Sequence, residues 1–144
     1  MSRSDSPRLL VYGAYGYTGR LVVERAVEHG YEPLVAGRDR TKTRGIATAH
    51  SLQARPFAVE DAADHLGNVD VVLNCAGPFD QTADPMVDAC IETETDYLDI
   101  TGELQVFERI HRRGGDAEAA GVTLLPGVGF DVVPTDCPAT HPHR

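Results

Sequence analysis

The chain has 144 residues, with 22 acidic against 13 basic side chains and a formal net charge of −9. This length predicts one compact domain with a real core, and the acidic surface argues against nucleic-acid binding because it repels phosphate. No apolar run reaches the roughly 18 residues of a membrane span, and the N-terminus lacks a signal-peptide core, which predicts a cytoplasmic protein that does not bind membranes.

The first predicted elements are a short apolar strand, a glycine-rich turn and an amphipathic helix. The strand covers residues 9–12, and the glycines follow with the spacing G-x-x-G-x-x-G. Gly13 allows a sharp turn out of a buried strand, and Gly16 removes a side chain where backbone would approach a phosphate closely. Gly19 lies one turn into the helix, where a Cβ would collide with the strand behind it. This arrangement predicts a dinucleotide-binding turn.

The start of this helix suits an anion. Its first amides, around Tyr17 and Thr18, lie at the positive end of the helix dipole. We expect Tyr15 and Tyr17 to pack against a ribose or against the core. A phosphate-loop NTPase would need Gly-Lys-Ser/Thr after the glycines, where this chain has Gly-Arg-Leu at residues 19–21. The turn therefore predicts binding of a dinucleotide pyrophosphate, and a plain strand-turn-helix is the alternative.

The second predicted strand, residues 32–37, ends at Gly37 and is followed by Arg38. An acidic residue there would hydrogen-bond the ribose hydroxyls of NAD, whereas arginine favours the 2′-phosphate of NADP. Arg40 would add to the same positive patch. A shift of one residue would instead bring Asp39 to the ribose and favour NAD. The sequence therefore predicts NADP, and NAD is the alternative cofactor.

The remaining chain alternates short apolar segments with helical ones. We expect a polar helix or loop at 39–52, strands at 54–59, 70–75, 96–100 and 122–126, and helices at 61–66, 83–94 and 103–120. Asp61 is the expected N-cap of the first of these helices, Pro85 lies in the first turn of the second, and Gly114-Gly115 interrupts the third. The apolar run at 70–75 is typical of a parallel strand buried on both faces. This β-then-α order predicts an α/β fold, a doubly wound parallel sheet of the Rossmann type.

Ligands of such sheets bind at the carboxyl ends of the strands, and the fourth predicted strand ends in Asn-Cys-Ala-Gly-Pro. Gly77 and Pro78 let backbone run close to a flat ligand, and Ala76 lies on the same loop. Asn74 would hold this loop or contact a ribose hydroxyl. These four residues complete the predicted cofactor site.

No catalytic residue is assigned. A Tyr-x-x-x-Lys pair is absent, because the only lysine is Lys42. Asp99 and Asp131 follow later strands and are candidates for substrate contact, with loop capping as the alternative. The odd number of cysteines without a C-x-x-C spacing predicts reduced thiols and no metal site. The single lysine together with the acidic excess favours adaptation to high salt, and an arginine-preferring, GC-rich genome is the alternative.

Five ordered motifs together carry a family resemblance. They are residues 13–20, 35–38, 74–79, 97–103 and 126–131. They resemble the NADP-binding domain of the saccharopine dehydrogenase-like family, and most of all the branch that includes trans-acting enoyl reductases. The resemblance implies hydride transfer between a nicotinamide cofactor and a small-molecule substrate with a C=C or C=N bond. It also implies a C-terminal domain for substrate binding and dimerisation.

The expected domain organisation is a disordered segment at 1–7, the dinucleotide-binding domain at 8–137 and a tail at 138–144. Because the tail stands where the family's substrate domain would begin, we expect this chain alone to bind cofactor without catalysis, and to associate as a homodimer. The alternatives are a non-catalytic dinucleotide-binding or redox-sensing module, an inactive truncated fragment, and a scaffold that binds nothing.

Overall fold

The computed structural model describes residues 6–129. The predictions for residues 1–5, for Asp131 and for the tail at 138–144 lie outside the described residues. Six strands form one sheet in the order β3-β2-β1-β4-β5-β6, and every neighbouring pair is parallel. The strands are β1 (Leu9–Tyr12), β2 (Leu34–Gly37), β3 (Ala54–Pro56), β4 (Val71–Asn74), β5 (Asp96–Asp99) and β6 (Leu124–Leu125). This order confirms the predicted doubly wound Rossmann-type sheet, in which β1 and β4 flank the point where the strand order reverses.

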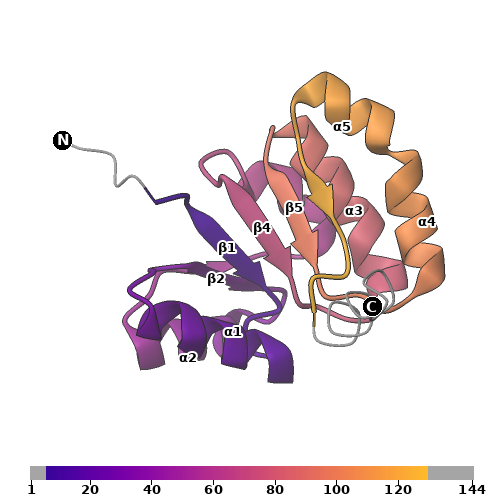
Figure 1. Ribbon diagram of the computed structural model, residues 1–144. Helices are drawn as coiled ribbons and strands as arrows, with labels where there is room; N and C mark the ends of the chain where they lie inside the picture. Colours follow the sequence, from indigo (N-terminus) through magenta and orange to yellow (C-terminus); the bar gives the residue numbers. More distant parts are fainter. Residues whose placement is uncertain (1–5, 130–144) are drawn as a thin grey trace, which may run out of the picture.

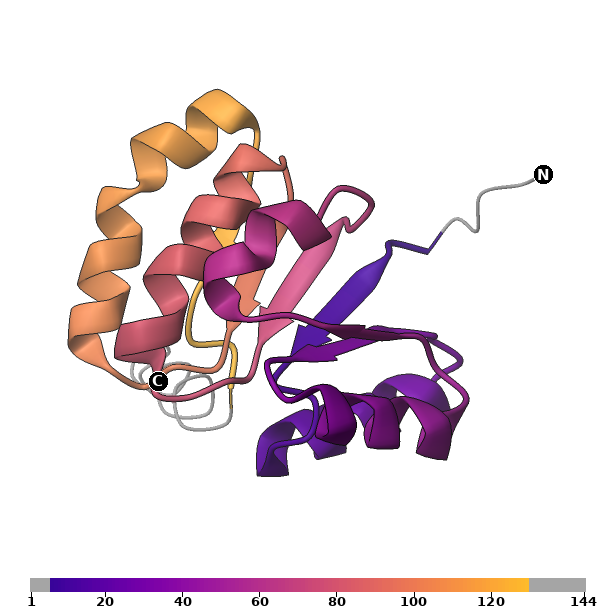
Figure 2. The same ribbon diagram turned by 180° about the vertical axis from the view of Figure 1, so that it is seen from behind.

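The helices form a layer on each side of this sheet (Figures 1 and 2). They are α1 (Tyr17–Glu28), α2 (Arg40–His50), the 3₁₀ helix η1 (Val59–His65), α3 (Phe79–Glu92), α4 (Leu104–Arg112) and α5 (Gly114–Ala120). The first two pack against β1 and β2, and the others lie on the opposite side (Figure 2). None of the helices within residues 6–129 is long and apolar enough to cross a membrane.

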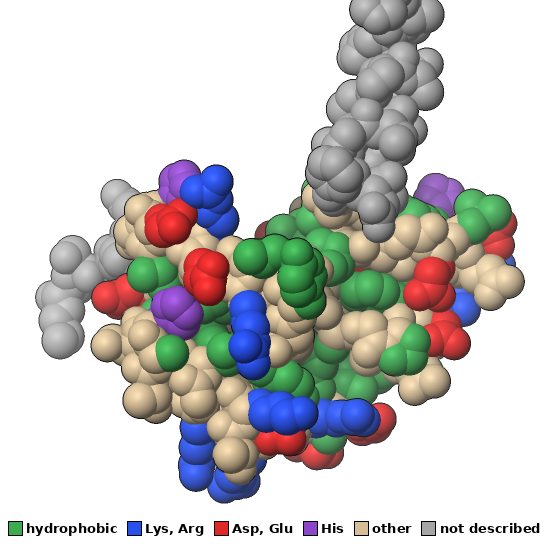
Figure 3. Space-filling model, turned by 90° about the horizontal axis from the view of Figure 1, so that it is seen from below, with side chains coloured by type: hydrophobic (Ala, Val, Ile, Leu, Met, Phe, Trp, Pro, Cys, Tyr) green, Lys and Arg blue, Asp and Glu red, His purple; other side chains and the backbone are tan. Residues whose placement is uncertain are grey.

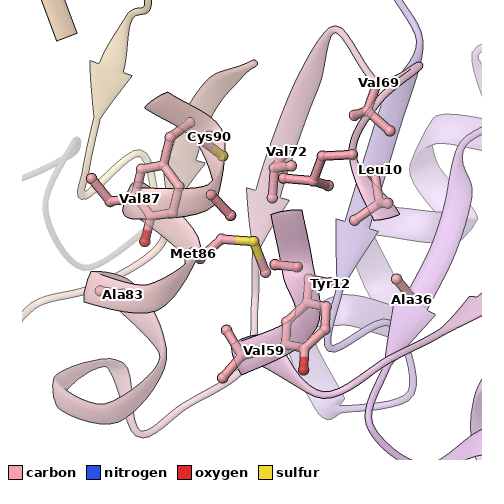
Figure 4. Packing of buried hydrophobic residues seen from close by; sticks show 14 of the residues in the cluster. Leu10, Tyr12, Ala36, Val59, Val69, Val72, Ala83, Met86, Val87 and Cys90 are labelled. Carbon is pink, nitrogen blue, oxygen red and sulfur yellow. The ribbon is translucent and has the colours of Figure 1, made fainter. Parts of the chain in front are cut away.

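Two hydrophobic clusters follow from the alternation of side chains along the strands. Leu10 and Tyr12 point into the larger cluster, which packs against η1, α3 and α4 (Figure 4). Val11, between them in sequence, points into the smaller cluster with Val23 of α1 and Ala47 of α2. Because β1 is covered on both faces, both sets of its side chains are apolar.

The strands β4 and β5 are buried on one face only, which corrects the prediction that residues 70–75 are covered on both. Val72 and Tyr97 are fully buried under α3, whereas Val71, Leu73 and Leu98 on the other face are only half-buried. The reason is topological: α1 and α2 lie over the other half of the sheet, and no helix within residues 6–129 covers this face of β4 and β5 (Figure 1).

Several element boundaries differ from those predicted. Helix α3 begins at Phe79, so Pro85 lies inside the helix rather than in its first turn. Ala58 rather than Asp61 precedes η1, which takes up part of the strand predicted at 54–59. The segment 39–52 is a helix, and the last long helix is broken at Arg113, one residue before the predicted glycines.

Candidate functional site

The carboxyl ends of β1, β2 and β4 surround a cavity of about 370 Å³. Figure 3 shows this edge of the molecule, where Lys and Arg side chains lie beside a central group of hydrophobic ones. The cavity brings together eight of the predicted cofactor residues: Gly13, Tyr15, Gly16, Gly37, Arg38, Ala76, Gly77 and Pro78. The other four, Tyr17, Thr18, Gly19 and Asn74, do not line it. A larger, mostly apolar hollow of about 600 Å³ lies elsewhere, between α4, α5 and β6.

Two of the three glycines in the first turn are required by the fold, and the third is not. Gly13 has a φ of +78°, and a Cβ on it would lie 2.8 Å from the backbone nitrogen of Ala76. A Cβ on Gly19 would strike the carbonyl oxygen of Gly13 and lie 2.9 Å from the Cα of Ala14. Gly16 has an ordinary φ of −72°, and a Cβ there would meet only the Gly13 carbonyl oxygen, at 3.4 Å. The side-chain space at Gly16 is therefore open to the cavity.

The amino end of α1 faces this turn without a side-chain cap. Gly16 is the N-cap residue and offers no hydrogen-bonding side chain, and the first turn of α1 contains no acidic residue. The first amides of a helix have no partner within it, so those of Tyr17 and Thr18 remain available to an anion. The Tyr17 side chain is 85% exposed, which excludes the predicted packing against the core.

Tyr15 packs against the end of β2. Its ring covers Gly37, where a Cβ would lie 2.5 Å from the Tyr15 Cε1 atom. The backbone N–H of Asp39 donates to the Tyr15 hydroxyl at 3.3 Å, and the Lys42 ammonium lies 5.7 Å from the ring centroid. The glycine at position 37 thus makes room for Tyr15, and the only lysine of the chain is brought to the same corner of the cavity.

Arg38 directly follows β2, is exposed and lines the cavity together with Glu60. Asp39 caps α2 instead, since its Oδ1 accepts a hydrogen bond of 2.9 Å from the backbone N–H of Lys42. The strand ends at Gly37, so the one-residue shift that would favour NAD is not observed. The arginine, and not the carboxylate, is the charged group that β2 presents to the cavity.

Asn74 holds the loop after β4. It is fully buried, its Oδ1 accepts from the Ala76 N–H at 3.1 Å, and its Nδ2 donates to the Thr82 hydroxyl at 3.2 Å. That hydroxyl donates to the Ala76 carbonyl at 2.6 Å. Of the two predicted roles of Asn74, the structure shows loop support, and burial keeps its side chain out of the cavity.

Asp99 is also fully buried, and its carboxylate ties neighbouring loops together. It accepts hydrogen bonds from the Tyr97 hydroxyl at 2.6 Å, the Thr101 N–H at 3.0 Å and the Gly127 N–H at 2.9 Å. Loop capping is therefore the observed role of Asp99, and the direct substrate contact is not. Burial and the Asp99 carboxylate raise the pKa of the Tyr97 hydroxyl, which keeps it a neutral donor.

Two thiols have raised pKa values, Cys75 at the cavity and Cys90 in the hydrophobic cluster under α3. Burial and, less strongly, Asp99 raise the pKa of Cys75 to about 12, and burial followed by Asp96 does the same for Cys90. Both cysteines are free. In the part of the chain that the structure describes, no three His, Cys, Asp or Glu side chains form a group that could hold a metal ion.

Comparisons with known proteins show the family to which this sequence and fold correspond. Residues 9–125 match the family model described as the saccharopine dehydrogenase NADP-binding domain. A saccharopine dehydrogenase-like oxidoreductase of Homo sapiens is 30% identical, over 89% of this chain and 35% of its own length. A trans-acting enoyl reductase of Mycobacterium leprae is 33% identical, over 89% of this chain and 33% of its own length. The chain thus spans about a third of the length of these curated relatives.

Solved structures share the fold. Apo saccharopine dehydrogenase (L-Glu forming) from Saccharomyces cerevisiae superposes with a TM-score of 0.74 at 20% identity, covering 88% of this chain and 28% of that one. AtPrR2 with NADP+ and (+)pinoresinol superposes with a TM-score of 0.61 at 19% identity, covering 89% of this chain and 52% of that one.

Proposed function

Because this chain belongs to the family of saccharopine dehydrogenase NADP-binding domains, we propose that the cavity at the ends of β1, β2 and β4 holds NADP(H). The observation that carries this proposal is the contrast among the three glycines of the turn. Packing explains Gly13 and Gly19, whereas at Gly16 the protein leaves a side-chain space empty beside uncapped helix amides. A pyrophosphate fits that space and supplies the acceptor that those amides lack.

The 2′-phosphate of the adenosine ribose would lie against Arg38. Its guanidinium is exposed at the cavity and carries no assigned ion pair within residues 6–129. Lys42 lies one helical turn away, beside Tyr15, and adds a second positive charge. Charge-assisted and bidentate contacts with a phosphate favour arginine at this position. The Asp39 carboxylate caps α2 and does not line the cavity, which leaves Glu60 as the acidic side chain that lines it with Arg38.

The nicotinamide half would extend along the loop after β4. Gly77 lines the cavity and has open side-chain space, since a Cβ there would meet only a Phe79 ring carbon at 4.0 Å. When bound, the reduced cofactor supplies a hydride to a C=C or C=N bond of a small molecule, and the protein orients the two reactants. We place this reaction in a longer protein, because the matched relatives are about three times as long as this chain.

A non-catalytic dinucleotide-binding or redox-sensing module is the second candidate function. Within residues 6–129, the one carboxylate predicted to contact substrate, Asp99, is sealed beneath the loops. The thiol that lines the cavity, Cys75, has a pKa raised to about 12 and is a poor proton donor at neutral pH. These two observations favour cofactor binding without turnover for the described residues alone.

The test is a charge reversal at the proposed 2′-phosphate contact. Arg38→Asp is expected to weaken NADPH binding by about 2–4 kcal/mol, or roughly 30- to 900-fold, because a charge-assisted pair is lost and repulsion replaces it. NADH binding should be spared, since the new carboxylate can accept from ribose hydroxyls. Arg44→Asp makes the same change of charge at an exposed position of α2 outside the cavity, and serves as the control. Equal NADPH affinity in the two variants by calorimetric titration would refute the assignment.

We further propose that the chain self-associates, that it is cytoplasmic and that it does not bind nucleic acid. Self-association is supported by the half-exposed Leu21 and Leu125 and by the uncovered face of β4 and β5. The net charge of −9 supports the lack of nucleic-acid binding. Sedimentation of the chain, alone and with a DNA duplex, tests association and nucleic-acid binding. A monomer at all concentrations, or co-sedimentation with the duplex, would contradict them.

A further inference from the structure

Ala76 is held at both of its backbone groups by buried or half-buried side chains. Its N–H donates to Asn74, and its carbonyl accepts from the Thr82 hydroxyl. Its backbone also lies so close to Gly13 that a Cβ on that glycine would be 2.8–2.9 Å from three of its atoms. Ala76 is therefore held in position both by Thr82 of α3 and by its close packing against Gly13 of the glycine turn.

The side chains that hold Ala76 belong to one hydrogen-bond network, with two branches that start at the Asn74 amide. The Asn74 amide donates to Thr82 and also to the Tyr97 hydroxyl, at 3.4 Å. Tyr97 in turn donates to the Asp99 carboxylate at 2.6 Å. An amide is needed at position 74, because two donors and one acceptor are used at once. Asp99 completes the network by accepting from the loops after β5 and β6.

We propose that Asn74 and Thr82 are positioning residues, which act through Ala76 to hold Gly77 and Pro78 where the nicotinamide half of the dinucleotide lies. This inference rests on the proposed NADP function. The Ala76 N–H is already engaged and its carbonyl is held by Thr82, so this residue offers the ligand a backbone surface in a fixed position. Arg38, at the other end of the cavity, shares none of the hydrogen bonds of this network.

Because Arg38 and the hydrogen-bond network around Ala76 are separate, the two halves of the dinucleotide should respond differently to a substitution in the network. Removing the Thr82 hydroxyl frees the Ala76 carbonyl, and the loop loses this side-chain hydrogen bond to α3, while the backbone bonds from Gln81 and Thr82 to the Pro78 carbonyl remain. Binding of the whole dinucleotide should weaken, because the ligand must then order the loop. Binding of adenosine 2′,5′-bisphosphate, which has the 2′-phosphate and no nicotinamide, should not change.

The experiment compares Thr82→Val, which keeps the shape and removes the hydroxyl, with the rescue variant Thr82→Ser. The matched control is Thr93→Val, because the Thr93 hydroxyl makes the same kind of bond to a backbone carbonyl, that of Ala89 at 2.8 Å, at the far end of α3. Affinities for NADPH and for adenosine 2′,5′-bisphosphate are measured on the full chain by calorimetry, together with Tm. Thr82→Val removes two hydrogen bonds, the one to the Ala76 carbonyl and the one from the Asn74 amide. Loss of the first, which holds the loop, predicts a roughly three- to tenfold weaker NADPH affinity, with normal affinity for Thr82→Ser and Thr93→Val.

Three results would overturn the positioning role. They are an unchanged NADPH affinity in Thr82→Val, an equal loss for both ligands, and an equal loss in Thr93→Val at the same change in Tm. If Thr82→Val does not fold, Tyr97→Phe interrupts the same network and is expected to show the same contrast between the ligands. Failure of the proposed function is distinct, because the unaltered chain would then bind neither ligand.

Discussion

The glycine turn allows ligand binding and folding to be perturbed separately. Replacing Gly16 by Val places a side chain in the space that we assign to the pyrophosphate. The protein atom that a Cβ at this position would meet is the Gly13 carbonyl oxygen, at 3.4 Å. Replacing Gly19 by Ala places a single methyl group against the Gly13 carbonyl oxygen and 2.9 Å from the Ala14 Cα. The larger substitution should therefore affect binding, and the smaller one stability.

The two magnitudes follow from the contacts. In Gly16→Val the backbone angles are ordinary, so only the N-cap preference is lost, about 1 kcal/mol of folding free energy. Blocking two charge-assisted hydrogen bonds from helix amides to phosphate, worth about 1.5–3 kcal/mol each, weakens binding by more than about a hundredfold. In Gly19→Ala the crowded atoms belong to backbone, so overpacking should cost about 1–3 kcal/mol or more, and Tm should fall by roughly 5–10 °C.

The assay combines thermal unfolding without ligand and NADPH titration of each folded variant. Gly16→Asn serves as a companion variant, because asparagine is a preferred N-cap and should restore stability while still filling the phosphate space. Full NADPH affinity in Gly16→Val with a native circular dichroism spectrum would show that the turn does not cradle phosphate. An unchanged Tm in Gly19→Ala would show that the turn is less tightly packed than described.

Three further outcomes are expected. Because the chain has a net charge of −9 and a single lysine, Tm should keep rising from about 0.1 to about 3 M KCl, although the Debye length is already about 3 Å at 1 M. A plateau below about 0.5 M would reject the high-salt interpretation. Burial raises the pKa of the Cys75 and Cys90 thiols from 9.0 to about 12, so their contribution to stability is present below pH 9 and is lost as the pH rises toward 12; alkaline unfolding followed by circular dichroism checks this, and a Cys90→Ala variant should lose less stability over that interval. The chain alone should bind NADPH and yet oxidise it only at background rate with a panel of enones and imines, and turnover with any of them would place the catalytic groups within these residues.

The sequence was most informative where backbone geometry dictates the residue type. The need for glycine at positions 13 and 19 follows from local sterics. A Cβ at Gly19 would collide as predicted, although with Gly13 and Ala14 of the turn rather than with the strand itself. The alternation of strand and helix also predicted the sheet correctly, because each short apolar run is long enough for a strand and too short for a helix. The position of Arg38 after β2 followed from the same reasoning.

The features that the sequence did not reveal depend on contacts between distant segments. A polar residue after a strand looks the same whether it faces a ligand or caps a loop, and Asp99 was resolved only by its bonds to Thr101 and Gly127. Tyr97 and Thr82 were missed for the same reason. The sequence also did not reveal that one face of β4 is only half-buried. An apolar run shows that a strand can be buried, but it does not show which elements cover it.

The glycine turn and the loop after β4 form a part of the cavity that is lined largely by backbone, and this explains why the buried side chains behind it matter. Gly13, Gly16, Gly77 and Ala76 present main-chain atoms and at most one methyl group to a ligand. Such a surface cannot adapt by changing rotamers, so its shape depends on how accurately the chain is held from behind. Asn74, Tyr97 and Asp99 provide that support from positions without solvent exposure. Substitutions in this buried layer should therefore weaken ligand binding without touching the ligand, although by less than substitutions of Arg38 or Gly16, which contact it directly in the proposed complex.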